Sequence, residues 1–390
     1  MIGKWGDNFA KKLNEKKNRD NYRAQNYIDK TEGKYIEINN KKYINFSNND
    51  YLGLTKELSV ISAGNAEALK WGAGTGASRL VSGTFTNVSN LEKKFAGWNK
   101  KARALMFNSG YNANIGIVSA LADEKTVVFC DKLNHASIYD GIFLSKAKIE
   151  RYPHKDVEFL EKLLIKNRDV EKKIIITDSV FSMEGDIAPL VEIAELSQKY
   201  ETLLIADEAH SAGLFGDDYA GITSMYNLQD KVDVIIGTLG KSFGAFGAFA
   251  ACDEILYDYF INSCRSFIFT TSLPPFIIGA LNRSYEIILT ENRGKEVLLK
   301  AENFAALLKE NGVDVGASRS QIVPIIVKSN SKSIELMNFL KEKGIYAPSI
   351  RPPTVPPNAS RVRISITYLH TDEDISKLSR EIINWSKKNV

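Results

Sequence analysis

Short runs of apolar residues recur along the middle of the chain, separated by segments with helical periodicity. The runs that have the length of a buried strand are Ala104–Phe107, Thr126–Phe129, Ile174–Thr177, Thr202–Ala206, Val232–Gly237 and Ala248–Ala251. Continuous apolar runs are typical of parallel strands covered on both faces, whereas alternating patterns are typical of sheets with one wet face. The pattern therefore predicts an α/β domain with a mainly parallel central sheet and helices on both faces.

The pattern differs before and after this central region. Near the N-terminus, Lys34–Ile38 and Tyr43–Phe46 flank a turn at Asn39-Asn40, which predicts a small hairpin. Beyond Pro274-Pro275 we predict one long helix and then a strand, a helix and a strand, at Phe276–Asn311, Gln321–Val327, Ser331–Lys343 and Arg361–Thr367. This length and pattern predict an N-terminal segment, residues 1–45, that packs with the small domain, a large domain, residues 46–290, and a smaller α+β C-terminal domain, residues 291–390.

The first residues carry an amphipathic pattern. Trp5, Phe9 and Leu13 recur at helical spacing, which predicts a helix that packs on the body of the protein or on a partner subunit. No apolar stretch of the chain approaches the roughly 20 residues that span a bilayer. The N-terminus lacks an apolar signal-peptide core, and its acidic residues Asp7 and Glu15 are atypical of a transit peptide. We therefore expect a cytoplasmic protein without membrane contact.

Composition narrows the class of protein further. The 390 residues are 44% hydrophobic and 25% charged, as in ordinary globular proteins. The formal net charge of +4 is small for this length, so it indicates no nucleic-acid partner. The three cysteines, Cys130, Cys252 and Cys264, are odd in number and widely spaced, which favours reduced thiols over disulfides or a metal site.

Polar side chains follow two successive apolar runs. Asp207 and His210 come after Thr202–Ala206, and Lys241 comes after Val232–Gly237. The carboxyl ends of parallel strands meet at one edge of a sheet, where ligands bind. A carboxylate there can keep a pyridine nitrogen protonated, an imidazole can hydrogen-bond a phenolic oxygen, and a buried lysine with a lowered pKa can form a Schiff base. This set indicates pyridoxal 5'-phosphate (PLP). The alternative is that Asp207 and Glu208 form a metal-binding or helicase-like acidic pair.

Other strand ends supply candidates for the rest of the site. The turn that contains Gly110 and Tyr111 opens a helix, whose backbone N–H groups can bind a phosphate, as can the Thr238 hydroxyl. The same turn is also explained by helix capping without a ligand. His135 follows another strand and can stack on a planar ring, although a single histidine is more often structural. Ser182 follows the next strand and can reach the same site.

The glycine-rich loop Gly72–Arg79 has two interpretations. It does not follow a strand, which argues against a dinucleotide-binding fingerprint. It either allows the backbone to approach a ligand, across a subunit boundary for example, or forms a flexible turn.

Several motifs together resemble one family. They are Asn49–Leu54, Gly76–Gly83, Phe181–Asp186, Asp207–Ser211, Gly237–Lys241 and Thr270–Pro275. With these motifs the chain resembles the α-oxoamine synthases, PLP-dependent transferases of fold type I that condense an amino acid with an acyl thioester. The resemblance extends from about residue 49 to residue 367.

The resemblance implies roles for particular residues. Lys241 would form the Schiff base, and catalysis would depend on Lys241, His135 and Ser182. The cofactor would be held by Gly110, Tyr111, His135, Ser182, Asp207, His210, Thr238 and Lys241, with Thr271 reaching its phosphate from the neighbouring subunit of a homodimer. Arg363 would bind the amino acid's carboxylate, since a guanidinium offers two parallel hydrogen bonds. Arg23, Asn49, Arg351 and Thr354 would contact substrates, and no metal is implied.

The C-terminal motifs favour one reaction within that family. Ile350–Pro356 and Arg361–Arg363 resemble the member of the biotin pathway that joins L-alanine to a pimeloyl thioester, of coenzyme A or of acyl carrier protein, with loss of CO2. The alternatives are condensation of glycine with acetyl-CoA and a non-enzymatic PLP-binding regulator.

Overall fold

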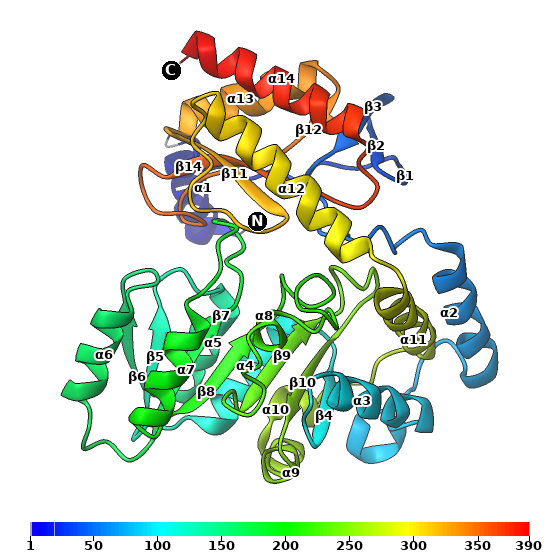
Figure 1. The fold of residues 1–390 in the computed structure, drawn as a ribbon, viewed down its shortest axis with the longest axis vertical. Coiled ribbons are helices and arrows are strands. Elements are labelled where there is room, and N and C mark those ends of the chain that lie inside the picture. Colours follow the sequence, from blue (N-terminus) through cyan, green and yellow to red (C-terminus); the bar gives the residue numbers. More distant parts are fainter. Residues whose placement is uncertain (1, 19, 390) are drawn as a thin grey trace. The chain divides into compact units, whose positions relative to one another are not determined.

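The protein forms two compact units. The computed structural model describes residues 2–18 and 20–389. The large unit comprises Asn49–Ser182 and Asp186–Leu299, and the small unit combines the described residues up to Asn48, the short stretch Met183–Gly185 and the residues from Lys300 onward (Figure 1). The short stretch belongs to a loop of the large unit's sequence, so the chain passes between the units there as well as near Asn48 and Leu299.

A seven-stranded sheet forms the centre of the large unit. In spatial order its strands are β4 (Arg103–Phe107), β10 (Ala248–Cys252), β9 (Val234–Thr238), β8 (Leu203–Asp207), β7 (Lys173–Asp178), β5 (Val127–Asp131) and β6 (Lys148–Tyr152). Neighbours are parallel except that β10 runs antiparallel to both β4 and β9. The predicted mainly parallel sheet is confirmed. Strand β6 was not predicted, because its sequence is polar and it lies at the sheet edge with only Tyr152 buried.

Helices cover both faces of this sheet (Figure 1). On one face the strands share a buried apolar core with α4 (Gly110–Leu121), α5 (Ala136–Ser145), α9 (Glu254–Ser263) and α10 (Arg265–Ile268). On the other face Phe95 of α3 (Thr86–Trp98) stacks on Phe249 of β10, with ring centroids 4.6 Å apart. The remaining helices of this unit are α2 (Leu58–Trp71), η1 (Arg79–Gly83), α6 (Val157–Lys166), α7 (Leu190–Lys199), α8 (Ile222–Met225) and α11 (Pro275–Thr290).

The small unit is built on two smaller sheets. The first contains β1 (Lys30–Glu32), β2 (Tyr35–Ile38), β3 (Lys41–Asn45) and β12 (Ile345–Tyr346), and the second contains β11 (Ile322–Lys328), β14 (Ser360–Ser365) and β13 (Ser349–Ile350). The small unit also contains the helices α1 (Gly3–Asn18), α13 (Asn330–Glu342) and α14 (Asp372–Asn389). The predicted hairpin is β2–β3, and its strand β3 pairs with β12 near the other end of the chain.

One prediction of secondary structure is wrong. The long helix predicted over Phe276–Asn311 is two helices, α11 and α12 (Arg293–Glu310). The break is stabilised because Arg293 pairs with Glu291 at 2.7 Å and donates to the Leu52 carbonyl at 3.1 Å. Helix α1 forms as predicted and buries none of its residues in the described chain, so of the two predicted packings, on the body or on a partner subunit, the first is not observed.

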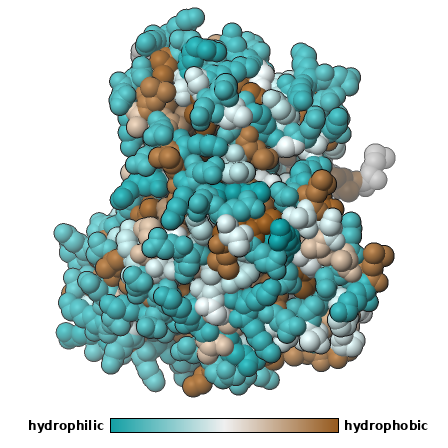
Figure 2. Space-filling view, turned by 45° about the vertical axis from the view of Figure 1, so that its right-hand side comes forward, coloured by the Kyte–Doolittle hydropathy of each residue, from teal (hydrophilic) through white to brown (hydrophobic). Residues whose placement is uncertain are grey.

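The visible surface is mainly hydrophilic. Hydrophilic residues cover most of the visible face in Figure 2, and apolar side chains lie between them in small groups. Among the described residues, no helix combines the length and the apolar character that a bilayer crossing requires.

Candidate active site

A cavity of about 270 Å³ lies at the carboxyl ends of the central strands of the large unit. The structure brings together many of the residues that the sequence predicts for the site. The predicted residues that line this cavity are Asn49, Gly110, Tyr111, His135, Ser182, Asp207, His210, Thr238 and Lys241. Residues that sequence reasoning did not assign to the site also line it, among them Asn114, Ser137 and Asp178. Asp178 and Asp207 end parallel strands of the sheet, and His135 and His210 follow such strands, which explains why these side chains converge at one edge.

The carboxylate of Asp207 is fixed at both oxygens. Oδ1 accepts the backbone N–H of Ala209 at 2.9 Å, and Oδ2 accepts the side-chain amide of Asn114 at 2.7 Å. Asp207 is only 3% exposed, so these donors replace water around a buried charge. Asn114 lies on α4, one turn after Gly110, and that helical spacing toward a strand-end acid is the signal that could have identified it.

His135 is held by its own helix end. Its Nδ1 accepts the backbone N–H of Ser137 at 3.3 Å and lies 2.7 Å from the Ser137 hydroxyl. Burial lowers the pKa of His135, so the ring is neutral at pH 7, and Nε2 carries the proton because Nδ1 is an acceptor. The backbone N–H of His135 donates to Asp178 at 2.8 Å. Burial and the nearby charge of Asp207 raise the pKa of Asp178 well above its usual value.

Lys241 and His210 are in direct contact. Lys241 Nζ lies 2.8 Å from His210 Nε2, and His210 Nδ1 lies 2.8 Å from the hydroxyl of Tyr51, which is fully buried. That hydroxyl in turn donates to Asn49 Oδ1 at 3.1 Å. The imidazole therefore links the amine to a buried tyrosine that sequence reasoning did not single out.

The start of α4 forms a cradle at the edge of the cavity. Ser109 caps the helix by accepting the backbone N–H of Asn112 at 3.2 Å. A Cβ atom at Gly110 would lie 2.3 Å from Cγ2 of Thr238, so only glycine allows this close approach. Unpaired N–H groups at a helix start attract an anion. The acid, the amine and this cradle fit the ring nitrogen, the aldehyde and the phosphate of PLP.

Ser182 lies on a loop whose base is held by ion pairs of His154 with Asp131 and Asp186. His154 contacts Asp131 at 3.1 Å through Nδ1 and Asp186 at 3.0 Å through Nε2. Burial opposes the charged ring, but the two carboxylates outweigh it and raise the pKa of His154 to about 9. The tip of the same loop belongs to the small unit, where Arg361 donates to the Met183 carbonyl at 2.9 Å.

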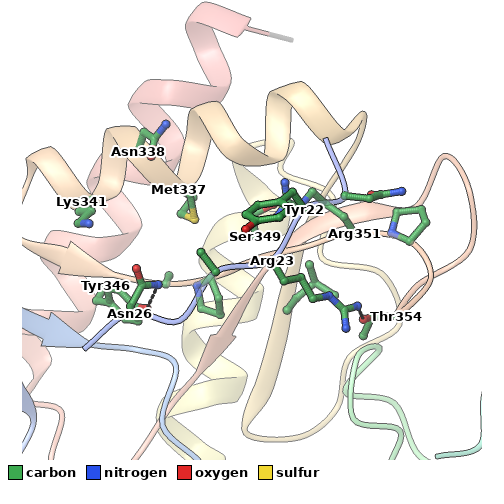
Figure 3. A pocket seen from close by; sticks show the side chains of 16 residues that line it. Tyr22, Arg23, Asn26, Met337, Asn338, Lys341, Tyr346, Ser349, Arg351 and Thr354 are labelled. Carbon is green, nitrogen blue, oxygen red and sulfur yellow. Dashed lines mark hydrogen bonds between the residues drawn. The ribbon is translucent and has the colours of Figure 1, made fainter. Parts of the chain in front are cut away.

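Most of the predicted substrate residues lie in the small unit. A second cavity, of about 510 Å³, is lined by Arg23, Arg351 and Thr354, and Arg23 donates to the Thr354 hydroxyl at 2.8 Å (Figure 3). The Arg351 guanidinium donates to the Asp20 carbonyl. Arg363 is not among the lining residues. It lies on β14, is 5% exposed and donates to Ser365 Oγ at 2.9 Å.

Neither Thr271 nor the glycine-rich loop, both considered for contacts across a subunit boundary, lines the cavity of its own chain. Thr271 is exposed and bridges to Ser78, and its carbonyl accepts the Asn108 amide at 2.9 Å. The glycine-rich loop Gly72–Arg79 contributes no lining residue. The structure of one chain therefore leaves their predicted role across a subunit boundary untested.

Comparison with known proteins identifies the family. The family described as aminotransferase class I and II matches residues 41–382. A curated protein of Bacillus cereus (strain Q1), called a putative 8-amino-7-oxononanoate synthase, is 40% identical over 385 residues, which cover 98% of each chain. The chain belongs to the class I and II aminotransferase family.

Solved structures narrow this family to one branch. A serine palmitoyltransferase variant from S. paucimobilis with a bound PLP–myriocin aldimine superposes with a TM-score of 0.92 at 28% identity, covering 100% of this chain and 98% of the other. An 8-amino-7-oxononanoate synthase from Francisella tularensis gives a TM-score of 0.77 at 29% identity, covering 89% and 98%. Within the class I and II family, the chain is a PLP-dependent α-oxoamine synthase with fold type I, as the sequence motifs predicted.

Proposed function

We propose that the protein is an 8-amino-7-oxononanoate synthase that condenses L-alanine with a pimeloyl thioester. The observation that carries this choice is the pair of arginines, Arg23 and Arg351, beside Thr354 in the small-unit cavity. A pimeloyl group ends in a carboxylate, which guanidinium groups bind well, whereas an acetyl or palmitoyl group has no such charge. The names of the curated relatives support the same substrate.

Bound PLP supplies an electron sink for the carbanion at the amino acid's Cα. Asp207 holds the proton on the ring nitrogen and is itself held by Asn114. Lys241 would hold the cofactor through its amine, which His210 contacts, and would serve as the base that removes the Cα proton of alanine and later returns one. Arg363 binds the carboxylate of alanine through paired hydrogen bonds.

In the proposed reaction each new bond replaces one that breaks. The Cα–carbonyl bond forms as the carbon–sulfur bond of the thioester breaks and the thiol leaves. The carboxylate of alanine then departs as CO2, and a proton takes its place. Ser182 and the neutral ring of His135 are the groups that polarise the thioester carbonyl, by donating the hydroxyl and the Nε2–H.

A substrate screen tests the proposal. The PLP-loaded protein is incubated with alanine, glycine or serine and with pimeloyl-CoA, pimeloyl acyl carrier protein, acetyl-CoA or palmitoyl-CoA, and thiol release and product mass are followed. We expect the highest kcat/KM for alanine with a pimeloyl thioester. A preference for glycine with acetyl-CoA, or for serine with palmitoyl-CoA, would replace the proposal, and no turnover with any pair would favour a regulator.

We also propose that the enzyme works as a homodimer in which Thr271 reaches the partner's phosphate site. Thr271 is exposed in its own chain and does not line its own cavity, which supports that arrangement. Mixing Thr271→Ala protein with Lys241→Ala protein tests it by subunit exchange. One site of a mixed dimer would have both residues intact and recover activity, whereas a Thr271 that served its own chain would give no recovery.

A further inference from the structure

We infer that Tyr51 is a positioning residue that sets which ring nitrogen of His210 carries the proton. The inference rests on the proposed function only for the state with cofactor bound. Its basis is the buried series of contacts from Asn49 through Tyr51 and His210 to Lys241. All of these residues belong to the large unit, and three of them line the cofactor cavity.

The direction of each hydrogen bond follows from the number of protons. A tyrosine hydroxyl has one proton, and that of Tyr51 is donated to Asn49 Oδ1 at 3.1 Å. At 2.8 Å from His210 Nδ1 the Tyr51 oxygen therefore acts as the acceptor, and Nδ1 carries a proton. In a neutral imidazole Nε2 is then a lone pair, which accepts an N–H of Lys241 at 2.8 Å. The amine is thus held by an acceptor.

The same hydroxyl can support the opposite tautomer. When the phenolic oxygen of PLP faces His210 Nε2, that nitrogen has to donate, and Nδ1 then needs a donor of its own. Rotation of the Tyr51 hydroxyl from Asn49 to His210 supplies that donor without moving the ring. Only a group that can both donate and accept a hydrogen bond can stabilise both tautomers of His210. Phenylalanine at this position can do neither, so it stabilises neither tautomer.

The other histidines provide internal references for a measurement, since the chain has four. His135 and His370 both accept a backbone N–H at Nδ1, from Ser137 and Thr367, so each carries its proton on Nε2. Both nitrogens of His154 face carboxylates, so that ring is doubly protonated. His210 is the one histidine of the described chain that we expect to carry its single proton on Nδ1.

Nitrogen NMR of the histidine rings tests the inference. Spectra of the full-length protein are recorded without and with PLP, and His210→Gln assigns the His210 signals. We expect the Nδ1–H form without cofactor and the Nε2–H form with it. Tyr51→Phe should abolish the single Nδ1–H form and give a mixture, and its kcat should fall about tenfold with an unchanged KM for alanine.

Tyr152→Phe is the matched control, because Tyr152 is also a buried tyrosine of the large unit but lies on β6 and does not line the cavity. It should leave the His210 signals and kcat unchanged. An Nε2–H form of His210 without cofactor, or Tyr51→Phe signals identical to those of the unmodified protein, would overturn the inference. Failure of the alanine and pimeloyl assay would instead reject the proposed function, because the cofactor-free spectrum does not depend on it.

Discussion

The cofactor cavity of the large unit and the arginine cavity of the small unit are built in different ways. In the first, polar groups such as Asn114, Asp178 and Asp207 are buried, and Asp207 binds Asn114. In the second, Arg23 and Thr354 lie on loops and are exposed. The buried groups therefore depend on one another for hydrogen bonds, whereas the exposed groups can bind water.

This difference has energetic consequences. Removing one partner from a buried pair leaves a charge or a polar group without solvent, which costs roughly 1–3 kcal/mol or more. An exposed hydrogen bond is exchanged for one with water, and its loss costs about 0–1 kcal/mol. Variants in the two cavities should therefore differ in the size of their effects.

Lys241→Ala should have the largest effect. The variant loses both the covalent attachment and the base, so kcat should fall by about 10³-fold or more. Borohydride treatment and peptide mass spectrometry should find PLP fixed at residue 241 in the unmodified protein only. The exposed Lys125→Ala is the control and should retain activity. A Lys241→Ala protein that still turns over would refute the assignment.

Arg363→Ala tests whether the size of a variant's effect on KM depends on the burial of the residue or on the unit in which the residue lies. Arg363 belongs to the small unit, yet it is buried on β14. Loss of paired charged hydrogen bonds should raise the KM for alanine by about 10²-fold. The KM for the thioester should change far less. Unchanged values of both constants would mean that another residue binds the carboxylate.

The sequence predicted the strand-end part of the site well, for a physical reason. Buried parallel strands leave a strong apolar signal, and the residue after each strand has a fixed position. The sequence alone therefore groups Asp207, His210 and Lys241. In the structure all three line one cavity. The weak, polar edge strand β6 gave no such signal.

Residues that act through others were missed. Asn114 and Tyr51 contribute through hydrogen bonds to Asp207 and His210 that depend on how a helix or a turn packs on the sheet. The break between α11 and α12 was missed for the same reason, because Arg293 stabilises it through the carbonyl of Leu52, which is distant in sequence. Local patterns carry little information about such contacts, and only Asn114 had a signal in its helical spacing from Gly110, so tertiary structure is needed to find the others.

Asn114→Ala tests the support of Asp207. The variant removes the amide donor from a buried carboxylate oxygen, so the Kd for PLP should rise about tenfold to thirtyfold. Titration of the cofactor-free protein followed by absorbance measures this change. Asn99→Ala is the control, since Asn99 is buried too but binds the Phe95 carbonyl away from the cavity. Equal Kd values for the two variants would show that Asn114 has no specific role.

The two units should also respond to pH in opposite directions. The pKa of His154 is raised to about 9, so the native large unit holds a proton that the unfolded chain releases above about pH 6.5, and stability falls between these values. Burial lowers the pKa of His370 to about 4, so the small unit loses stability as pH falls from about 6.5 to 4.

Urea unfolding at several pH values measures both effects. His154 should account for about 2 kcal/mol after a discount for its partial exposure, and the buried His370 for about 3 kcal/mol. His154→Gln should remove the alkaline loss alone, and His370→Gln the acid loss alone. An alkaline loss that persists in His154→Gln would mean that other groups cause it.

Arg23→Ala should have the smallest effect. Arg23 is exposed, so water screens its attraction for the pimeloyl carboxylate and Arg351 remains, and the KM for the pimeloyl thioester should rise only about twofold to fivefold. The KM for alanine should not change. Lys343→Ala removes another positive charge from the small unit outside this cavity and is the control. A rise of 10²-fold would show that the loop closes over the substrate and becomes as buried as the cofactor site, which would erase the contrast between the two cavities.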